Sequence, residues 1–224
     1  MTIMLLKKLI NNCPNNLNKV KVRGLSSDTR TLKKGELFFA LDGEKYNGSN
    51  FIDKALKKGA AAIVTKKKFN NYRNIIYKRN VLKELVFACN QYYKNKPKNI
   101  IAVTGTNGKS SVADFFYQIL KLNSVKAATI GTLGIRKGNN LKKTNLTSLD
   151  LINFHKELEK IKKLNINNVL VEASSHGLEQ GRLNGINYLG GIFTNLSQDH
   201  LDYHKSMKNY FNSKLILFKK LIKS

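Results

Sequence analysis

The sequence predicts an α/β protein, with a small N-terminal α/β domain followed by a larger domain built on a mostly parallel, doubly wound sheet. Short apolar runs alternate with segments of helical periodicity, and a glycine-rich loop joins one such run to an amphipathic segment near the middle of the chain. Strands that alternate with helices favour a parallel sheet with helices on both faces. A polar stretch at residues 92–99 contains the second of two prolines. We place the boundary there, so the predicted domains are residues 1–96 and 97–224.

The composition is that of a globular protein. The chain has 224 residues, of which 42% are hydrophobic, enough for one large domain or two small ones. Lys7 and Lys8 interrupt the apolar N-terminal stretch before it reaches the length of a signal core, and no run of about 18 apolar residues occurs elsewhere. Cys13 and Cys89 lie far apart without a metal-binding pattern, so we expect reduced thiols. These features predict a cytoplasmic protein with no membrane partner.

The charge raises a second class of function, nucleic-acid binding. Forty Lys and Arg residues against 14 Asp and Glu give a net charge of +26, which would attract polyanions. The lysines are spread along the chain, with only short runs such as residues 66–68, and they are interleaved with asparagine more than with aromatic residues. We therefore expect a generally solvated basic surface and no nucleic-acid partner. A basic nucleic-acid-binding protein remains the alternative that charge alone supports.

In the first domain, short apolar runs and turn residues alternate from residue 20 to residue 65. The pattern predicts a helix at 52–58, closed by Gly59, and then a strand at 61–64. A further helix is expected at 80–95. This part of the chain therefore predicts a small α/β module.

The second domain begins with a β-branched run at 99–104, which is typical of a buried parallel strand. The next segment, 110–122, has helical periodicity, and its predicted apolar face comprises Val112, Phe115, Phe116, Ile119 and Leu120. A second helix is predicted at 150–164, with a shared face made of Leu151, Phe154, Leu158 and Ile161. Further strands are predicted at 127–132, 168–173 and 191–195.

The loop "GTNGKSS" at residues 105–111 predicts a phosphate-binding site, although Val103 stands where the common G-x-x-x-x-G-K-[ST] pattern has its first glycine. Gly105 and Gly108 lack a Cβ, so backbone N–H groups can converge on phosphate oxygens at the positive end of the next helix. Lys109 can neutralise phosphate charge, and the Ser110 hydroxyl can hold Mg²⁺. Asn107-Gly108 could instead form a hairpin turn, but a hairpin needs a strand after it, and the periodicity there is helical.

Polar residues follow two other predicted strands, at the edge where doubly wound sheets bind ligands. The strand predicted at 168–173 carries Glu172 at the end of an otherwise apolar run, and the strand predicted at 191–195 brings Asn195, then Asp199 and His200. A lone acid at a strand end is often a cap or a surface charge. Beside a phosphate loop, Glu172 and His200 become candidate Mg²⁺ ligands, because the metal neutralises charge in phosphoryl transfer. His176 and His204 are equally consistent with structural histidines.

Taken together, the motifs resemble the Mur ligase family, and within it the members that form the tripeptide precursor. The resemblance covers nearly the whole chain and is carried by the order and spacing of these segments: "SSDTRTLKKGELFFALDGEKYNGSNFIDKA" at 26–55, "VTGTNGKSS" at 103–111, "LTSLD" at 146–150, "VEASSHGLEQGRLNGI" at 171–186, "FTNLSQDHLDYH" at 193–204 and "YFNSKLILF" at 210–218. The family's phosphate loop has the form T-G-T-N-G-K-[ST], which also lacks the first glycine.

The resemblance implies roles for named residues. It implies a P-loop ATPase domain in which Lys109 contacts the phosphates and Ser110 holds Mg²⁺, with Glu172 and His200 as the candidate metal ligands from the strand ends. The expected catalytic residues are Lys109, Lys214 and His200. The implied ATP-binding residues are Gly105, Thr106, Asn107, Gly108, Lys109, Ser110 and Ser111. The implied substrate-binding residues are Ser27, Thr29, Glu44, Lys45, Tyr46, Thr147, Ser148, Ser174, Gln180 and Arg182. Thr147 and Ser148 occupy the positions of a pair of threonines in the family, and Leu149 replaces the proline or glycine that often follows this pair. Lys214 matches a lysine that the family carries as a carbamate. Sequence alone does not distinguish it from a solvated lysine on a helix surface.

The activity that the resemblance implies is ATP-dependent amide ligation in peptidoglycan synthesis. The expected substrates are UDP-MurNAc-L-Ala-D-Glu and a diamino acid, either meso-diaminopimelate or L-lysine, and we expect a monomer. The family has three domains, and the sequence stops shortly after Lys214, so we expect an N-terminal fragment that is catalytically incomplete alone. A binding-only module and another Mur ligase remain alternatives.

Overall fold

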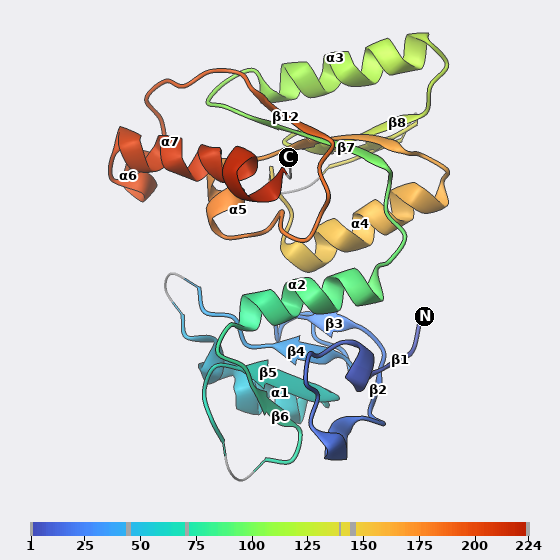
Figure 1. Cartoon of the computed structure of the whole chain (residues 1–224), viewed down its shortest axis with the longest axis vertical. Helices are drawn as coiled ribbons and strands as arrows, with labels where there is room; N and C mark the ends of the chain where they lie inside the picture. Colours follow the sequence, from blue (N-terminus) through green and yellow to red (C-terminus); the bar gives the residue numbers. More distant parts are fainter. Residues whose placement is uncertain (1, 44–45, 70–71, 139, 144–146, 223–224) are drawn as a thin grey trace. The chain divides into compact units, whose positions relative to one another are not determined.

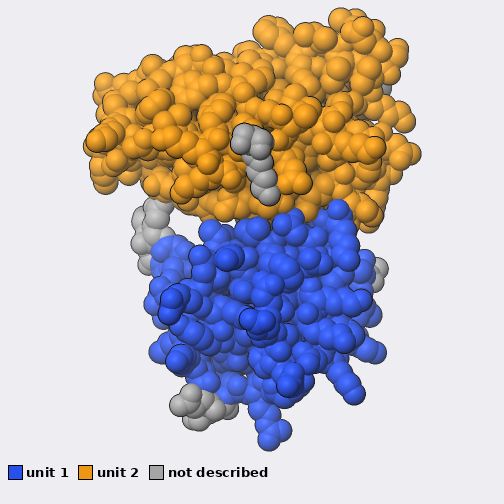
Figure 2. Space-filling model, in the orientation of Figure 1, with its two compact units in different colours: residues 1–94 blue, residues 95–224 orange. Residues whose placement is uncertain are grey.

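The chain folds into two compact units, residues 1–94 and 95–224 (Figure 2). The structure is a computed structural model that describes residues 2–43, 46–69, 72–138, 140–143 and 147–222. Both units are α/β, and parallel pairing dominates their main sheets, which confirms the predicted fold class. In the described ranges, no helix combines the length and the apolar character needed to cross a membrane.

The first unit contains a four-stranded parallel sheet in the order β3-β4-β5-β6. Its strands are β3 (Leu25–Ser26), β4 (Leu37–Phe39), β5 (Ala62–Thr65) and β6 (Ile75–Tyr77). Its helices are η3 (Gly48–Phe51), α1 (Ile52–Lys57) and α2 (Val81–Tyr92). The N-terminal segment adds β1 (Met4–Leu5), η1 (Leu6–Lys8), η2 (Asn15–Leu17) and β2 (Lys21–Val22), with β1 and β2 antiparallel.

The core of this unit forms where α1 meets the sheet. Phe38 and Ile63 of neighbouring strands pack with Ile52 and Ala55 of the helix, and all four side chains are buried. Asn47 accepts a hydrogen bond from the Ser49 amide at the start of η3, and Gly59 follows α1 with a left-handed backbone. The Asn47 cap marks where the helical segment begins, and Gly59 explains why the helix predicted at 52–58 ends as expected.

The second unit is a six-stranded sheet in the order β10-β9-β8-β11-β7-β12. The four strands β8, β11, β7 and β12 are parallel, whereas β9 and β10 form an antiparallel hairpin on one side. The strands are β7 (Asn99–Thr104), β8 (Ala127–Gly131), β9 (Gly134–Lys137), β10 (Asn140–Lys142), β11 (Asn168–Glu172) and β12 (Gly190–Phe193). The sequence did not predict the β9–β10 hairpin, in which polar and charged residues outnumber apolar ones.

Helices cover both faces of this sheet (Figure 1). They are α3 (Lys109–Leu122), α4 (Leu151–Lys163), α5 (Ser175–Glu179), α6 (Leu201–His204), α7 (Met207–Ile216) and the π-helical turn η4 (Leu217–Leu221). Successive strand residues face opposite sides. Val169 and Val171 therefore pack with Phe154 and Leu158 of α4, while Leu170 packs with Ala113 of α3.

The predicted apolar face of α3 was partly wrong. Val112 and Phe116 pack against the sheet as expected, but Phe115 and Ile119 are 62% and 58% exposed. The buried side chains are Ala113 and Tyr117. Because Ala113 is small, the helix lies close to Val103 and Leu170, and the contact stripe is rotated away from Phe115 and Ile119.

One buried histidine makes the second unit sensitive to acid. His155 of α4 is fully buried, its Nε2 lies 2.9 Å from the Asn184 carbonyl oxygen, and its Nδ1 has no hydrogen-bond partner among the described residues. Burial, with a smaller effect of the Lys96 charge, lowers the pKa of His155 to about 4. The ring is therefore neutral at pH 7, with Nε2 donating to the carbonyl.

We predict that this histidine destabilises the folded unit as the pH falls below 6.5. The pKa in the folded state lies below the unfolded value, so its contribution is fully present above pH 6.5 and is lost progressively as the pH falls towards 4. The loss between pH 7 and pH 5 should be about 2 kcal/mol. The measurement is urea unfolding of the second unit at both pH values in the native chain and in His155→Gln, which can still donate to Asn184. An equal pH dependence in the two proteins would contradict the assignment.

Candidate active site

The candidate site lies at the carboxyl ends of the parallel strands of the second unit. Glu172 pairs with Val103, and Phe193 pairs with Thr104, so β11 and β12 end level with the end of β7. The chain then leaves β7 through Gly105 and enters α3 after Gly108. Register alone therefore brings the glycine loop and Glu172 to one edge of the sheet.

Close packing explains why glycine is needed at two positions here. Gly105 has a φ of +145°, and a Cβ on it would lie 1.9 Å from Thr194 Oγ1. Gly131, at the end of β8, lies so close to Glu172 that an added Cβ would be 2.2 Å from Oε1. The first glycine fits the prediction from the loop motif. The second was not identified from sequence, because its reason is the neighbouring strand.

Glu172 is 1% exposed and is held by hydroxyl groups. Ser110 Oγ donates to Glu172 Oε2 at 3.1 Å, and Thr132 Oγ1 donates to the same oxygen at 2.9 Å. Glu172 forms no ion pair among the described residues. A buried carboxylate without a paired cation is costly, so this side chain is suited to receive one.

Two lysines converge on the loop. Lys109 Nζ donates to the carbonyl oxygens of Gly105 and Thr106 at 2.8 and 2.7 Å. Lys214 Nζ, from α7, donates to the same Gly105 oxygen at 2.8 Å and lies 4.2 Å from the centroid of the Tyr210 ring. Lys214 is 1% exposed, so the alternative of a solvated helix lysine is wrong.

The environment shifts both lysines towards the neutral amine. Burial lowers the pKa of Lys109, while the nearby charges of Glu172 and Asp199 oppose the shift. Burial and, to a smaller extent, the positive charge of Lys109 lower the pKa of Lys214 to about 8, with Asp199 opposing both effects. Lys214 therefore loses its proton more readily than an ordinary lysine, around pH 8.

The loop is tied to the segment that follows β12. Asn107 N donates to Asn195 Oδ1 at 3.0 Å, and Thr194 Oγ1 donates to the Asn107 carbonyl at 2.6 Å. Thr106 Oγ1 donates to the Ser197 carbonyl and lies 3.2 Å from the Tyr210 hydroxyl. Thr132 and Thr194 were missed as site residues. Each directly follows an observed strand end, Gly131 of β8 or Phe193 of β12. The predicted strands, 127–132 and 191–195, included both residues, so a search of the residues that follow each strand passed over them.

His200 does not contact Glu172 or Ser110 among the described residues. It is about half exposed, with a left-handed backbone and its Nε2 3.4 Å from Asp199 Oδ2. Its ring lies near those of His176 and Tyr210, with centroids 5.1 and 6.2 Å away. In the described ranges, no three His, Cys, Asp or Glu side chains form a metal-binding cluster. The structure therefore brings Ser110 to Glu172 but not His200.

His204 behaves as a structural histidine. It is 4% exposed, with Nε2 3.0 Å from Ser175 Oγ and Nδ1 3.3 Å from Glu179 Oε2. Its ring packs on Tyr210 at a centroid distance of 5.1 Å. This contact supports the ring that lies under Lys214.

The residues expected to bind substrate in the second unit form one hydrogen-bonded group. Ser148 Oγ donates to the Glu172 carbonyl at 3.2 Å and lies 3.0 Å from Ser174 Oγ. Arg182 donates to the Ser148 carbonyl at 3.1 Å and to Gln180 Oε1 at 2.5 Å. Thr147 Oγ1 lies 3.0 Å from Thr132 Oγ1. Ser148 is 2% exposed, so its hydroxyl orients the end of β11 in this structure.

The expected substrate residues of the first unit lie around β3 and the loop after β4. Thr29 is buried, Ser27 is half-buried, and Tyr46 is 68% exposed, with its ring 6.4 Å from that of Phe51. Glu44 and Lys45 lie outside the described residues.

Comparison with known proteins identifies relatives over both units. The model described as "Mur ligase middle domain" matches residues 103–224, and that described as "Mur ligase family, catalytic domain" matches residues 21–109. A curated relative from Rickettsia typhi, named UDP-N-acetylmuramoyl-L-alanyl-D-glutamate--2,6-diaminopimelate ligase, is 44% identical over 91% of this chain and 43% of its own length. A protein of the same name from Bradyrhizobium diazoefficiens is 39% identical over 91% of this chain and 42% of its own. The chain thus spans less than half the length of these relatives.

Solved structures give the same result. The structure of a protein with that name superposes with a TM-score of 0.80 at 31% identity, covering 92% of this chain and 43% of the other. A MurF ligase from Thermotoga maritima in complex with ADP shares the fold alone, with a TM-score of 0.54 at 18% identity over 88% of this chain and 43% of the other.

We predict that the charge of Lys109 contributes to the low pKa of Lys214. Replacing Lys109 by Met removes the like charge, so the pKa of Lys214 should rise from about 8 towards the ordinary lysine value. Asp199→Asn removes an opposing negative charge and should lower it. NMR titration of the Lys214 side chain with carbon-13-labelled lysine measures both shifts, and Lys156→Met on the exposed side of α4 is the control. A Lys214 pKa that does not respond to either change would contradict the assignment.

Proposed function

The chain belongs to the Mur ligase family, and from this premise we propose that it supplies the nucleotide-binding and carboxylate-activating part of an ATP-dependent amide ligase in peptidoglycan precursor synthesis. The proposed substrate is UDP-MurNAc-L-Ala-D-Glu, held by the first unit as a UDP-sugar-binding domain. The names of the relatives favour meso-diaminopimelate over L-lysine as the added amino acid. We further propose that the protein works in the cytoplasm as a monomer, without nucleic acid or membrane as a partner.

The observation that carries this proposal is the contact between Ser110 of the phosphate loop and the buried carboxylate of Glu172. If the loop served only as a turn, the structure would not need a buried carboxylate beside the start of α3. In a nucleotide site, the hydroxyl and the carboxylate belong together, because both are oxygen ligands of the kind that Mg²⁺ prefers.

The residues present fit a Mg²⁺ ion. Magnesium usually binds through one or two carboxylates, water and substrate phosphates rather than through an all-protein cage. Glu172 and Ser110 would hold it, while the proposed third ligand, His200, makes no contact with them in this structure. When bound, the ion would supply positive charge to neutralise the transferring phosphoryl group.

The loop and α3 are arranged to bind phosphate. The first-turn amides of α3, at Lys109, Ser110 and Ser111, have no acceptor within the helix and point out of its positive end. We propose that Gly105, Thr106, Asn107 and Gly108 complete the ATP-binding loop. Lys109 would exchange its two carbonyl partners for phosphate oxygens, which form stronger hydrogen bonds to an ammonium group.

The proposed reaction has two steps. A substrate carboxylate oxygen attacks the γ-phosphorus of ATP, the bond to the bridging oxygen breaks, and ADP leaves. The amino group of the diamino acid then attacks the acyl carbon, phosphate leaves, and the amine proton passes to solvent or a base. Lys109 and the loop amides would stabilise the charge on the phosphoryl oxygens, so catalysis rests on positioning and electrostatics rather than on a protein nucleophile.

Lys214 is proposed to act as a carbamate. Its lowered pKa supplies neutral amine near pH 8, and the free amine is the form that adds to carbon dioxide. The product would place a negative charge beside Lys109, where two ammonium groups now share one carbonyl oxygen. That change relieves the repulsion between the lysines.

The remaining substrate contacts are proposed for Thr147, Ser174, Gln180 and Arg182. The Arg182 guanidinium is planar and can bond two oxygens of a carboxylate or phosphate. In this structure it bonds Gln180 and the Ser148 carbonyl, so substrate would compete for groups that are already ordered. Ser148 itself would act by orienting Glu172 and Ser174. Ser27, Thr29, Glu44, Lys45 and Tyr46 are the proposed contacts of the first unit.

We predict that nucleotide binding depends on Lys109 and that its magnesium dependence resides in Glu172. Lys109→Ala should weaken binding of Mg·ATP to the purified chain by at least about tenfold, because one charge-assisted contact is lost. Glu172→Gln should leave metal-free ADP binding nearly unchanged while reducing the gain in affinity on adding Mg²⁺. Isothermal titration calorimetry measures both effects.

The control is Lys156→Ala, which removes an exposed lysine of α4 in the same unit and should bind as the native chain does. Saturable binding of UDP-MurNAc-L-Ala-D-Glu would support the proposed substrate. If Mg·ATP does not bind, while DNA or RNA binds with an affinity that falls steeply with salt, the function proposed for this chain is wrong.

A further inference from the structure

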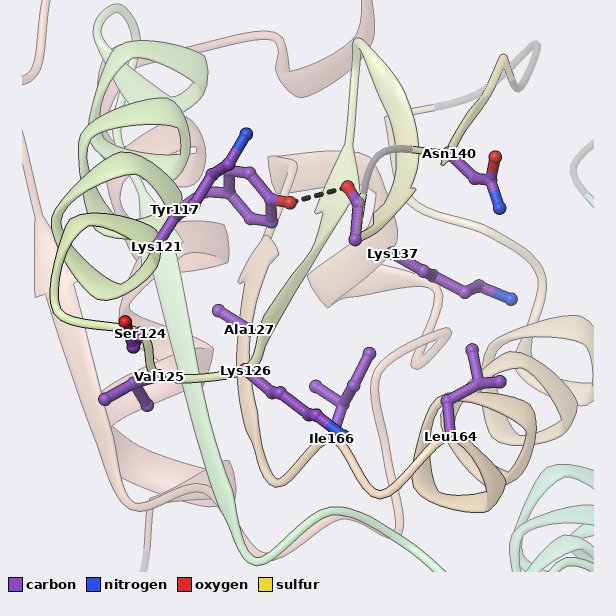
Figure 3. Close-up of a pocket in the computed structure, with 11 residues that line it drawn as sticks. Tyr117, Lys121, Ser124, Val125, Lys126, Ala127, Lys137, Asn140, Leu164 and Ile166 are labelled. Carbon is purple, nitrogen blue, oxygen red and sulfur yellow. Dashed lines mark hydrogen bonds between the residues drawn. The ribbon is translucent and has the colours of Figure 1, made fainter.

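A pocket lies at the opposite end of the large sheet from the candidate site, where the parallel strands begin (Figure 3). Its volume is about 470 Å³, and residues that line it include Tyr117, Lys121, Val125, Lys126, Leu164 and Ile166. This size falls within the range of natural small-molecule sites. Ala127 lines the pocket at the start of β8, whereas Gly131 at the other end of that strand touches Glu172. At about 3.3 Å per residue, the two ends are roughly 13 Å apart, so this pocket is separate from the phosphate loop.

Two similar turns between helix and strand create the pocket. After α3, Ser124 takes a left-handed conformation, its amide bonds to the Lys121 carbonyl, and the Val125 amide bonds to Leu120. After α4, Asn165 does the same, with amide bonds from Asn165 to Lys162 and from Ile166 to Ile161. Both turns are helix C-caps that satisfy the last carbonyls. They lead into the neighbouring strands β8 and β11 and leave Val125 and Ile166 facing the same space.

The β9–β10 hairpin closes the pocket on a third side. Lys137 is paired with Ala128 across the sheet, and the Gly138 carbonyl accepts a hydrogen bond of 2.5 Å from the Tyr117 hydroxyl. Figure 3 shows this bond across the upper part of the pocket. It joins α3 to the hairpin, so the wall is held by a specific contact.

The lining combines apolar side chains with uncompensated positive charge. Val125 and Leu164 remain 40% and 54% exposed, whereas Ile166 and Ala127 of the same lining are buried. None of the described residues that line the pocket is acidic. Lys137 is neutralised by Glu157 at 2.7 Å, whereas Lys121 and Lys126 form no ion pair among the described residues. A ligand that fits must therefore cover apolar surface and bring negative charge to these two lysines.

We propose that this pocket binds a small organic anion, an aryl or alkyl carboxylate, whose apolar body lies against Val125, Leu164 and Ile166 and whose carboxylate pairs with Lys126, while Lys121 adds positive charge at a separate place on the lining (Figure 3). Burying the exposed apolar side chains favours the body of the ligand. The two ammonium groups favour the carboxylate and select against a neutral molecule of the same shape. A free phosphate lacks the body and gains only the charge.

The test uses the purified chain and three probes: phenylbutyrate, the neutral alcohol with the same carbon skeleton, and inorganic phosphate. Calorimetry should show saturable binding of one phenylbutyrate per chain, at least about tenfold tighter than the alcohol or phosphate. Amide NMR shifts should change at Ala127 and Gly138. The double variant Lys121→Gln/Lys126→Gln should bind phenylbutyrate at least about tenfold more weakly, because the charged contact with Lys126 and the added positive charge of Lys121 are both lost.

A matched control is Lys156→Gln with Lys163→Gln, two lysines of α4 that do not line the pocket, and it should bind like the native chain. Val125→Trp should fill the mouth and abolish binding; if that variant does not fold, the lysine pair, which is exposed, decides the result. The proposal is overturned if phenylbutyrate does not saturate, if the alcohol binds equally well, or if the lysine variant keeps the native affinity.

Discussion

The register of β7 between β11 and β12 is the constraint on which the candidate site depends. Because Val103 pairs with Glu172 and Thr104 pairs with Phe193, three chain segments leave the sheet at the same level. Gly105 must then pass so close to Thr194 that no Cβ fits. A slip of one residue would turn Glu172 to the other face of the sheet and break its bond to Ser110. The buried apolar faces on both sides of β11 fix this register.

The charged groups at this edge of the sheet determine which ligand the site is suited to hold. Two lysines donate to one carbonyl oxygen, and the partners of the buried carboxylate among the described residues are hydroxyl groups. Like charges are thus brought together, while the acid lacks a cation. A nucleotide with a divalent cation would satisfy both, since its phosphates pair with Lys109 and its metal with Glu172.

Sequence reasoning succeeded where the signal was local. Three signals lie within short segments: the β-branched run of β7, the glycines of the loop and the acid at the end of β11. They predicted a buried strand, a turn into a helix and a carboxylate at a strand end. Sequence reasoning failed where a distant neighbour decides the outcome. Phe115 was assigned to the buried face of α3 because periodicity cannot tell how closely Ala113 lets the helix approach the sheet. Gly131 and Thr194 matter only because of strands beside them.

The most direct measurement is a high-resolution structure of this chain with Mg²⁺ and a non-hydrolysable ATP analogue. The account predicts that Lys109 Nζ leaves the carbonyl oxygens of Gly105 and Thr106 for phosphate oxygens, with Mg²⁺ contacted by Ser110 and Glu172. A nucleotide bound elsewhere, or a loop in which Lys109 and Glu172 keep their present partners, would contradict it.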